Sequence, residues 1–166
     1  MMHPGMATAD FEVFYERSVD AVYRYASRLT GGDRVRTDEL VQETYLAVLL
    51  ADVDAEPTTS YLITACRRRF LDQLRSEQRR RTREQHAAGP AEISPIDPAE
   101  IQAGPAVAAL STLSDEHRAA LVLRYVDDLP VRDVARHLGR RVRATESLLV
   151  RARLALRAAY REGDRS

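Results

Sequence analysis

Apolar residues recur at helical spacing along most of the chain, and no stretch shows the strict alternation that marks a β-strand. The first run predicts a helix over residues 10–29, with Asp10 as N-cap and Gly31-Gly32 as its stop. A second helix is expected to begin at Thr37 as N-cap, and a third to span about 59–83. The apolar stripe of the second helix consists of Leu40, Val41, Tyr45, Val48 and Leu49.

The C-terminal part predicts further helices separated by short turns. After an apolar stretch at 106–113, Ser114 is a plausible N-cap for a helix whose apolar face includes Leu121, Val122 and Tyr125. A turn at 127–130 leads to a short helix over 131–138, which Gly139 ends. A last helix is expected over 143–161.

Between these parts lies a stretch that cannot continue a helix. Residues 87–105 contain four of the seven prolines, interspersed with alanine, glycine and acids. We therefore predict an all-α fold of two small helical domains, 1–85 and 107–166, joined by a flexible linker at 86–106.

Formal net charge is zero, but the charges are strongly segregated. Residues 58–85 hold 8 arginines and 3 acids, and residues 140–166 again hold 8 arginines and 3 acids. Residues 1–57 are acidic, with 11 acids and 5 arginines, and 86–113 have no arginine. Two basic blocks, each ending a predicted domain, favour two contacts with one polyanion, although each could also be a solvated helix face. All 25 basic residues are arginine, which codon bias in a GC-rich genome would explain without any functional reason.

Residues 131–149 fit a helix-turn-helix. Val134 and Leu138 share one face of the short helix, Ala135 is small where two helices cross, and Gly139 suits the tight turn. Val142 and Leu148 are expected to close the core from the second helix. In this motif the N-terminal part of the second helix reads base edges in the major groove, while later arginines contact phosphates.

Other chemistry is not indicated. Cys66 lies on the third helix among apolar neighbours and is interpreted as a small core residue. The four histidines are scattered, so no metal site is predicted, and no cofactor, nucleophile or phosphate-loop motif appears. Because no catalytic motif appears, we do not expect an enzyme. We expect a cytoplasmic protein, because neither a signal peptide nor a membrane-spanning run is visible.

Several segments, in order, resemble bacterial sigma factors of the sigma-70 family. Residues 38–45 (DELVQETY) look like its polymerase-binding segment, and 61–75 (YLITACRRRFLDQLR) resemble the adjoining promoter-melting helix. Residues 113–125, 129–135 (LPVRDVA) and 151–157 (RARLALR) resemble the family's C-terminal domain. The two-domain size is similar to that of the compact extracytoplasmic-function (ECF) group.

The resemblance implies a role and the residues for it. Domain 1–85 would bind core RNA polymerase and melt the −10 promoter element, and domain 107–166 would read the −35 element. Because Arg68, Glu146 and Leu148 depart from residues common in the family, the preferred promoter bases do not follow from it. The implied polymerase contacts are Asp38, Leu40, Val41, Gln42, Glu43 and Thr44; the −10 contacts are Tyr61, Arg67, Arg68, Asp72 and Arg75; the −35 contacts are Arg141, Arg143, Ala144, Thr145, Glu146, Ser147, Arg151 and Arg153.

Three functional readings remain open at this point. A sigma factor would need core polymerase and promoter DNA as partners, and an anti-sigma protein inserted between its two domains could hold it inactive. A stand-alone helix-turn-helix regulator would bind duplex DNA by itself, but this reading leaves the first basic block without a role. A protein-interaction module would use its arginines on an acidic partner. No small-molecule substrate is expected in any of the three.

Overall fold

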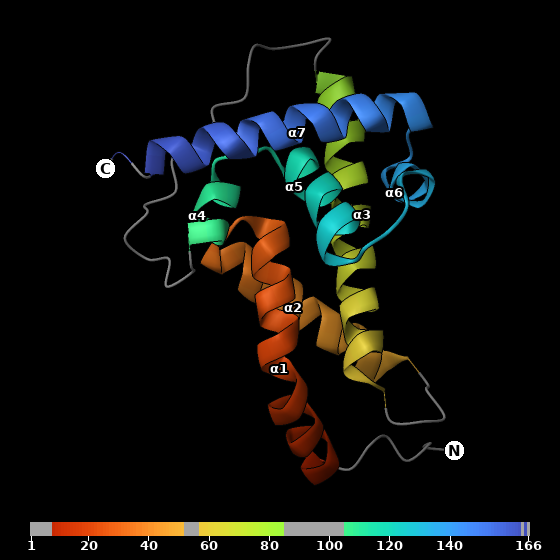
Figure 1. Ribbon diagram of the computed structural model, residues 1–166. Helices are drawn as coiled ribbons and strands as arrows, with labels where there is room; N and C mark the ends of the chain where they lie inside the picture. The colour runs from red at the N-terminus through yellow and green to blue at the C-terminus, as the bar shows by residue number, and fades with distance from the viewer. Residues whose placement is uncertain (1–7, 52–56, 85–104, 164, 166) are drawn as a thin grey trace.

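The computed structural model describes residues 8–51, 57–84, 105–163 and 165, and every regular element in these ranges is a helix (Figure 1). The all-α prediction is therefore confirmed. The helices are α1 (Thr8–Thr30), α2 (Arg34–Leu50), α3 (Thr59–Glu84), α4 (Pro105–Ser111), α5 (Asp115–Leu121), the π-helical turn η2 (Val122–Val126), α6 (Val131–Leu138) and α7 (Val142–Gly163).

The start of α2 differs from the sequence-based prediction. Asp33, not Thr37, is the N-cap, and its carboxylate accepts a hydrogen bond from the Arg36 amide at 3.1 Å. Thr37 lies inside the helix and is 1% exposed, with its hydroxyl 2.7 Å from that of Thr30. The prediction chose the wrong cap because both residues suit the position, and only packing against α1 buries Thr37. Similarly, α1 begins at Thr8, so Asp10 lies in its first turn rather than at its cap.

The predicted cap of α5 is confirmed. The Ser114 side chain accepts from the amide of His117, and Asp115 and Glu116 occupy the first turn, where the helix dipole favours acids. The helix then widens into η2 and ends at Asp127. The side chain of Tyr125, which was expected on the apolar face, is 54% exposed, so that part of the prediction is wrong.

The buried apolar residues form one main core that crosses the predicted domain division. Val22, Leu29 and Leu62 from the first three helices belong to the same cluster as Val122 and Val134 from the later ones. A small second cluster of Leu113, Leu121 and Ala152 lies under α7. Removing this apolar surface from water is the main force that holds both groups of helices in place.

The helices form two groups that pack directly against each other. Helices α1, α2 and α3 contact one another, and α7 packs across α4, α5 and α6. In Figure 1, α7 lies across one end of the molecule, and α3 runs from the lower part of the view up behind it. Helix α1 also contacts α4 and α5. The predicted linker falls almost wholly on residues 85–104, outside the described ranges, so the domain boundaries stay a prediction. No helix in the described ranges is long and apolar enough to span a membrane.

Candidate nucleic-acid interface

The turn of the helix-turn-helix has the predicted geometry. Gly139 follows α6 with φ 64° and ψ 34°, the left-handed region that favours glycine. Its amide donates to the Arg136 carbonyl at 3.2 Å, and the next amide, of Arg140, donates to the Ala135 carbonyl at 2.9 Å. These two bonds satisfy the last carbonyls of α6 and turn the chain sharply into α7. The prediction of a helix-turn-helix over 131–149 is confirmed in its local geometry.

The inner face of α7 holds a residue that was predicted to touch DNA. Thr145 is fully buried, and its hydroxyl donates to the Arg141 carbonyl at 3.1 Å, so it cannot reach a base. Thr145 and Leu148 instead form the core contact of the recognition helix, and Leu148 is 1% exposed. Val142, which was predicted in the core, is 45% exposed. The helix is therefore rotated relative to the prediction, with Thr145 in place of Val142 on the inside.

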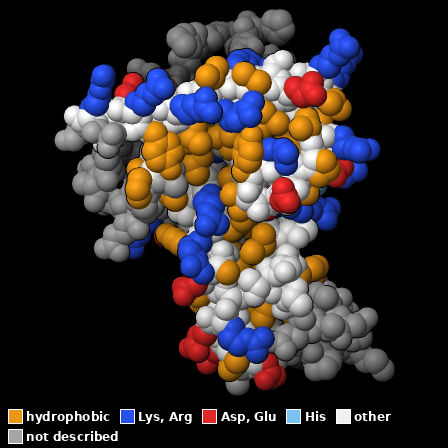
Figure 2. Space-filling view, viewed as in Figure 1, with side chains coloured by type: hydrophobic (Ala, Val, Ile, Leu, Met, Phe, Trp, Pro, Cys, Tyr) orange, Lys and Arg blue, Asp and Glu red, His pale blue; other side chains and the backbone are white. Residues whose placement is uncertain are grey.

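The outer face of α7 presents most of the predicted DNA contacts. Arg143, Ser147 and Arg151 are exposed and follow at intervals of four residues, so they share one side of the helix. Figure 2 shows a row of arginine side chains along the edge of the molecule where α7 lies. A basic, exposed helix that follows a tight turn has the shape and charge that the DNA major groove accepts. The exposed members of the predicted set are Arg141, Arg143, Ala144, Glu146, Ser147, Arg151 and Arg153.

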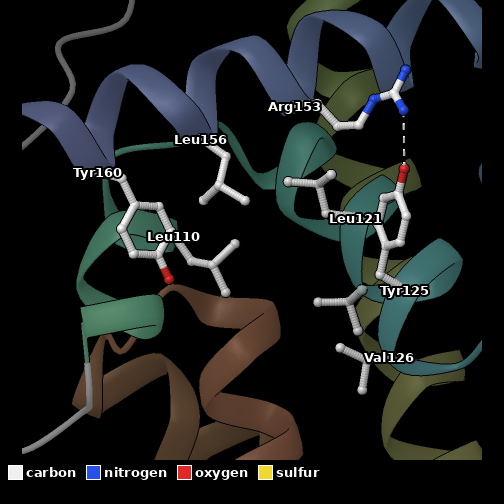
Figure 3. Close-up of a pocket in the computed structure, with 8 residues that line it drawn as sticks. Leu110, Leu121, Tyr125, Val126, Arg153, Leu156 and Tyr160 are labelled. Atoms are coloured by element: carbon white, nitrogen blue, oxygen red, sulfur yellow. Dashed lines mark hydrogen bonds between the residues drawn. The ribbon is translucent and has the colours of Figure 1, made fainter.

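Arg153 lies seven residues after Glu146 on α7 and also reaches the η2 segment. Its guanidinium Nη1 is 3.4 Å from the Tyr125 hydroxyl, across an apolar groove (Figure 3). The groove has a volume of about 370 Å³ and lies between α7, α4 and the α5–η2 segment. Its apolar lining consists of Leu110, Leu121, Val122, Tyr125, Val126, Leu156 and Tyr160. Arg153 is thus a rim residue of this groove, and its assignment to the −35 contacts stays a prediction.

Helix α3 carries the second basic surface. Tyr61, Arg68, Asp72 and Arg75 are spaced by seven, four and three residues, which places them along one side of the helix. Tyr61 is 45% exposed, and Arg68 and Asp72 are also exposed. Such a stripe offers an aromatic ring for base stacking next to arginines for phosphates. The loop residues 52–56, next to this stripe in the chain, lie outside the described ranges.

Arg67, the fifth predicted −10 contact, does not lie on this stripe and pairs with Asp127 instead. Its Nη1 lies 3.3 Å from the Asp127 carboxylate, and only 18% of its side chain is exposed. The same carboxylate accepts a hydrogen bond from the Tyr25 hydroxyl at 2.8 Å. Asp127 was expected to serve only the turn after η2, and here it joins that turn to α1 and α3.

The predicted polymerase contacts lie on two different sides of α2, one buried and one exposed. Leu40, Val41 and Thr44 are buried, at 1%, 5% and 0% exposure, so they cannot meet a partner while the helix stays packed. Gln42 is exposed, and Asp38 and Glu43 are partly exposed. The outer side also presents apolar residues that the prediction missed: Leu46, Leu49 and Leu50 are 56%, 46% and 85% exposed. Leu49 was predicted on the inner stripe, which is wrong.

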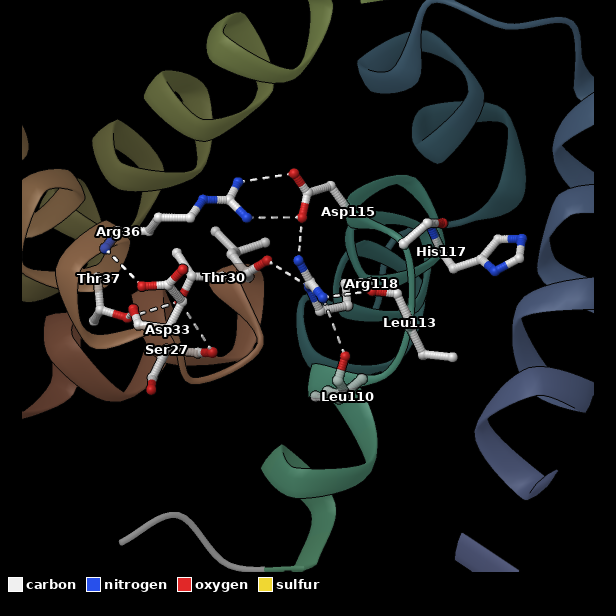
Figure 4. A network of polar contacts seen from close by, with 12 residues as sticks. Ser27, Thr30, Asp33, Arg36, Thr37, Leu110, Leu113, Asp115, His117 and Arg118 are labelled. Atoms are coloured by element: carbon white, nitrogen blue, oxygen red, sulfur yellow. Dashed lines mark hydrogen bonds and ion pairs between the residues drawn. The ribbon is translucent and has the colours of Figure 1, made fainter. Parts of the chain in front are cut away.

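A polar network joins the two groups of helices (Figure 4). The Arg118 side chain is 4% exposed, and its Nε donates to the carbonyl of Leu29, near the end of α1, at 3.0 Å. Arg118 also pairs with Asp115, whose carboxylate accepts two hydrogen bonds from Arg36 of α2, at 2.8 and 3.0 Å. No sequence pattern indicated this network, because Arg118 has the spacing of an ordinary surface arginine.

The packing shifts the pKa values of several ionisable side chains. Burial by itself raises the pKa of Asp115, but the hydrogen bonds from Arg36 and the charge of Arg118 outweigh it, and the net pKa is lowered. Burial, followed by the Asp127 carboxylate, raises the pKa of the Tyr25 hydroxyl far above its ordinary value. Burial raises the pKa of the Cys66 thiol to about 12, which agrees with its predicted place in the core. Among the described residues, no group of three His, Cys, Asp or Glu could hold a metal ion.

Two family models match the two segments of the chain that carry these basic surfaces. The family model of sigma-70 region 2 matches residues 14–80, which include α3. The model of sigma-70 region 4 matches residues 105–156, which include the helix-turn-helix. The two matches together span most of the chain, in the order that the segments resembling the family suggested.

Whole-chain relatives agree with these matches. The ECF RNA polymerase sigma factor SigL of Mycobacterium tuberculosis is 29% identical over 169 residues, covering 95% of this chain and 94% of that protein. The ECF RNA polymerase sigma factor SigM of Bacillus subtilis is 26% identical over 155 residues, covering 90% and 94%. The sigma factor RpoE of Bartonella quintana, solved with the anti-sigma factor NepR, has a similar fold, with a TM-score of 0.51, 21% identity, and coverage of 93% and 98%.

Proposed function

Because this chain belongs to the sigma-70 family of promoter-recognition factors, and its curated relatives are ECF members, we propose that it directs RNA polymerase through two separate DNA contacts. In this proposal α3 engages the −10 element and α7 reads the −35 element. The single observation that supports it most is that each matched region contains one exposed arginine-rich helix face. A stand-alone duplex-binding regulator would leave the α3 face without a use.

For the −35 element, the base-reading residues are the exposed ones at the start of α7. Arg143 has the geometry to pair with a guanine edge, and Glu146 can accept from a cytosine amine. Arg151, two turns further along, is better placed for a phosphate. Thr145 and Leu148 hold the helix from inside, so the departure of Leu148 from the family's usual basic residue concerns packing rather than promoter choice.

For the −10 element, the proposed contact is the stripe of Tyr61, Arg68, Asp72 and Arg75. An unpaired base can stack on the Tyr61 ring, while the arginines lie along the backbone of the separated strand. Melting would be favoured because the Tyr61 ring can stack on a base only after that base has left the duplex. Arg67 would join this surface only after its ion pair with Asp127 opens, and Arg75 is fully available only after its hydrogen bond to the His137 carbonyl of α6 breaks.

We propose that the outer side of α2 contacts core polymerase. Asp38, Gln42 and Glu43 remain from the predicted set. The exposed Leu46, Leu49 and Leu50 extend the same surface. Exposed leucines beside polar residues are typical of a face that a protein partner covers. Leu40, Val41 and Thr44 support this face from within the core.

The test is run-off transcription with purified bacterial core polymerase over a pool of promoter fragments, with and without the protein. Start sites that depend on the protein are expected. Arg68→Ala and Arg143→Ala should each lower their yield about tenfold or more, because each removes a contact worth about 1–3 kcal/mol. Arg80→Ala is the matched control, since Arg80 is exposed on α3 and pairs only with Glu84 within the helix. Duplex binding by the protein alone, without stimulated transcription, would favour the regulator instead.

An anti-sigma protein is a further proposed partner, as found for the Bartonella quintana relative. The expected mode, insertion between the two halves, meets an obstacle here, because Arg118 donates directly to the Leu29 carbonyl across the boundary. An inhibitor would therefore either displace these contacts or bind the outside of the packed form. Co-purification of the full chain from its native host, followed by identification of bound proteins, tests for such a partner.

A further inference from the structure

The first turn of α7, which carries the proposed base-reading residues, has little support from its own sequence. Arg140, Arg141 and Arg143 surround the start of the helix, where the helix dipole is also positive and disfavours cations. The first hydrogen bond of the helix runs from the Thr145 amide to the Arg141 carbonyl at 3.0 Å, so Arg141 is the N-cap residue. An arginine side chain has no acceptor atom for the free amides of this turn. The turn therefore depends on contacts with other helices.

One such contact comes from α5. Nη2 of Arg140 pairs with Oε1 of Glu116, and the same oxygen accepts a hydrogen bond from Gln78 of α3 at 3.2 Å. Glu116 lies in the first turn of α5, where the helix dipole favours an acid. Only 34% of the Arg140 side chain and 24% of the Glu116 side chain are exposed, so water screens this pair less than a pair at the open surface.

Arg140 is also fixed through its backbone. Its amide donates to the Ala135 carbonyl at 2.9 Å, which ties the turn to α6, while its side chain ties the turn to α5. Arg143 follows three residues later, so a movement of Arg140 would displace the guanidinium that the proposed function places on a guanine edge. Recognition groups need to be held within about 0.5 Å of their working position. The ion pair therefore lies where it can control base reading without touching a base.

We propose that Glu116 and Arg140 form a positioning pair, which fastens the first turn of α7 to α5 and thereby sharpens the reading of the −35 element. The inference rests on the proposed function for its effect on promoter choice, but the contact itself does not depend on that function. Arg136, the neighbouring exposed arginine of α6, pairs with Asp133 of its own helix, so it does not link two helices in this way. A direct contact of Arg140 with a DNA phosphate would need the ion pair with Glu116 to open.

The first test is amide hydrogen exchange of the full chain, with Glu116→Ala, Arg140→Ala and the double variant. The Thr145 amide makes the first hydrogen bond of α7, so its exchange rate reports how firmly this turn is closed. We expect each single variant to exchange this amide about threefold faster or more, and the double variant to exchange it no faster than the Glu116→Ala variant. Glu16→Ala and Arg24→Ala remove the same charges from exposed positions on α1 and should leave the rate unchanged.

Two results of this experiment would overturn the pair. Arg140→Ala could accelerate exchange of the Thr145 amide equally with and without Glu116, which would mean that the two side chains act independently. Alternatively, both single variants could keep the wild-type rate, which would mean that the first turn of α7 does not depend on the contact.

The second test is run-off transcription with core polymerase on two templates, a promoter that the protein uses and the same promoter with its −35 element scrambled. The ratio of the two yields measures −35 reading, because changes in polymerase binding affect both templates alike. Each single variant should lower this ratio about threefold, and the double variant should lower it no further. If Arg140→Ala lowers the ratio equally with and without Glu116, Arg140 contacts DNA itself and the positioning role is overturned. A wild type that supports no promoter-dependent start would refute the proposed function, while the exchange experiment would still decide whether the pair holds the helix.

Discussion

Gly31 after α1 and Gly139 after α6, two of the three glycines with positive φ in the described residues, offer a test of how closely the halves approach. Gly31 has φ 71° and Gly139 has φ 64°, so alanine meets similar backbone strain at both, about 1–2 kcal/mol. Their surroundings differ. A Cβ on Gly31 would lie 2.7 Å from Nη1 of Arg118 and 3.0 Å from the Ser111 Cα, whereas a Cβ on Gly139 would have no atom within 4 Å.

The additional cost at Gly31 follows from how firmly Arg118 is held. Its guanidinium is 4% exposed and bonded to the Leu29 and Leu113 carbonyls, so it cannot swing away as a surface side chain would. Overpacking of this kind costs about 1–3 kcal/mol. We expect Gly31→Ala to lose about 2–4 kcal/mol of unfolding free energy and Gly139→Ala about 1 kcal/mol, since lower chain entropy in the unfolded state offsets part of the strain.

Thermal and urea unfolding followed by circular dichroism would measure both losses. For a chain of this size, about 1 kcal/mol shifts Tm by roughly 2–4 °C, so the two variants should be clearly separated. In an Arg118→Ala background the cost of Gly31→Ala should fall towards that of Gly139→Ala. Equal losses for both glycines in the wild-type background would refute the reasoning, because Gly31 would then not lie against Arg118 in solution.

Three further outcomes follow from the same structure. Because the pKa of Asp115 is lowered in the folded chain, the contribution of its carboxylate to stability is present above the ordinary pKa of 3.8 and is lost as the pH falls below it. Urea unfolding measured from pH 7 to pH 3 should show this loss. Asp115→Asn should reduce the pH dependence of the unfolding free energy. Cys66 is fully buried with a pKa of about 12, so a thiol reagent at pH 8 should label it only in denaturant, and rapid labelling of the native chain would contradict its core position. In salt titrations with −35 duplexes, Arg143→Ala should relax base preference, whereas Arg151→Ala should weaken all sequences alike and lower the salt slope by about 1; the same effect from both would refute the division between base and phosphate contacts.

The sequence alone determined the helices and their order. Periodicity of apolar residues, Ser114 as a cap, and Gly139 as a turn residue are local signals, and local signals specify local backbone conformation. The helix-turn-helix and the family resemblance followed from the same short-range patterns. So did the core position of Cys66, because it lies on the apolar side of a long helix.

The tertiary structure alone decided which side of each helix faces a partner. Thr145 was placed on DNA and Val142 in the core, but the two positions are three residues apart and close together around the helix, so periodicity alone does not decide which of them is buried. No sequence pattern predicted the cluster of Arg36, Asp115 and Arg118. Arg36, Asp115 and Arg118 are separated by up to 82 positions and look like surface charges in sequence. They become one partly buried cluster only when the two halves pack, because partial removal from water strengthens their mutual contacts.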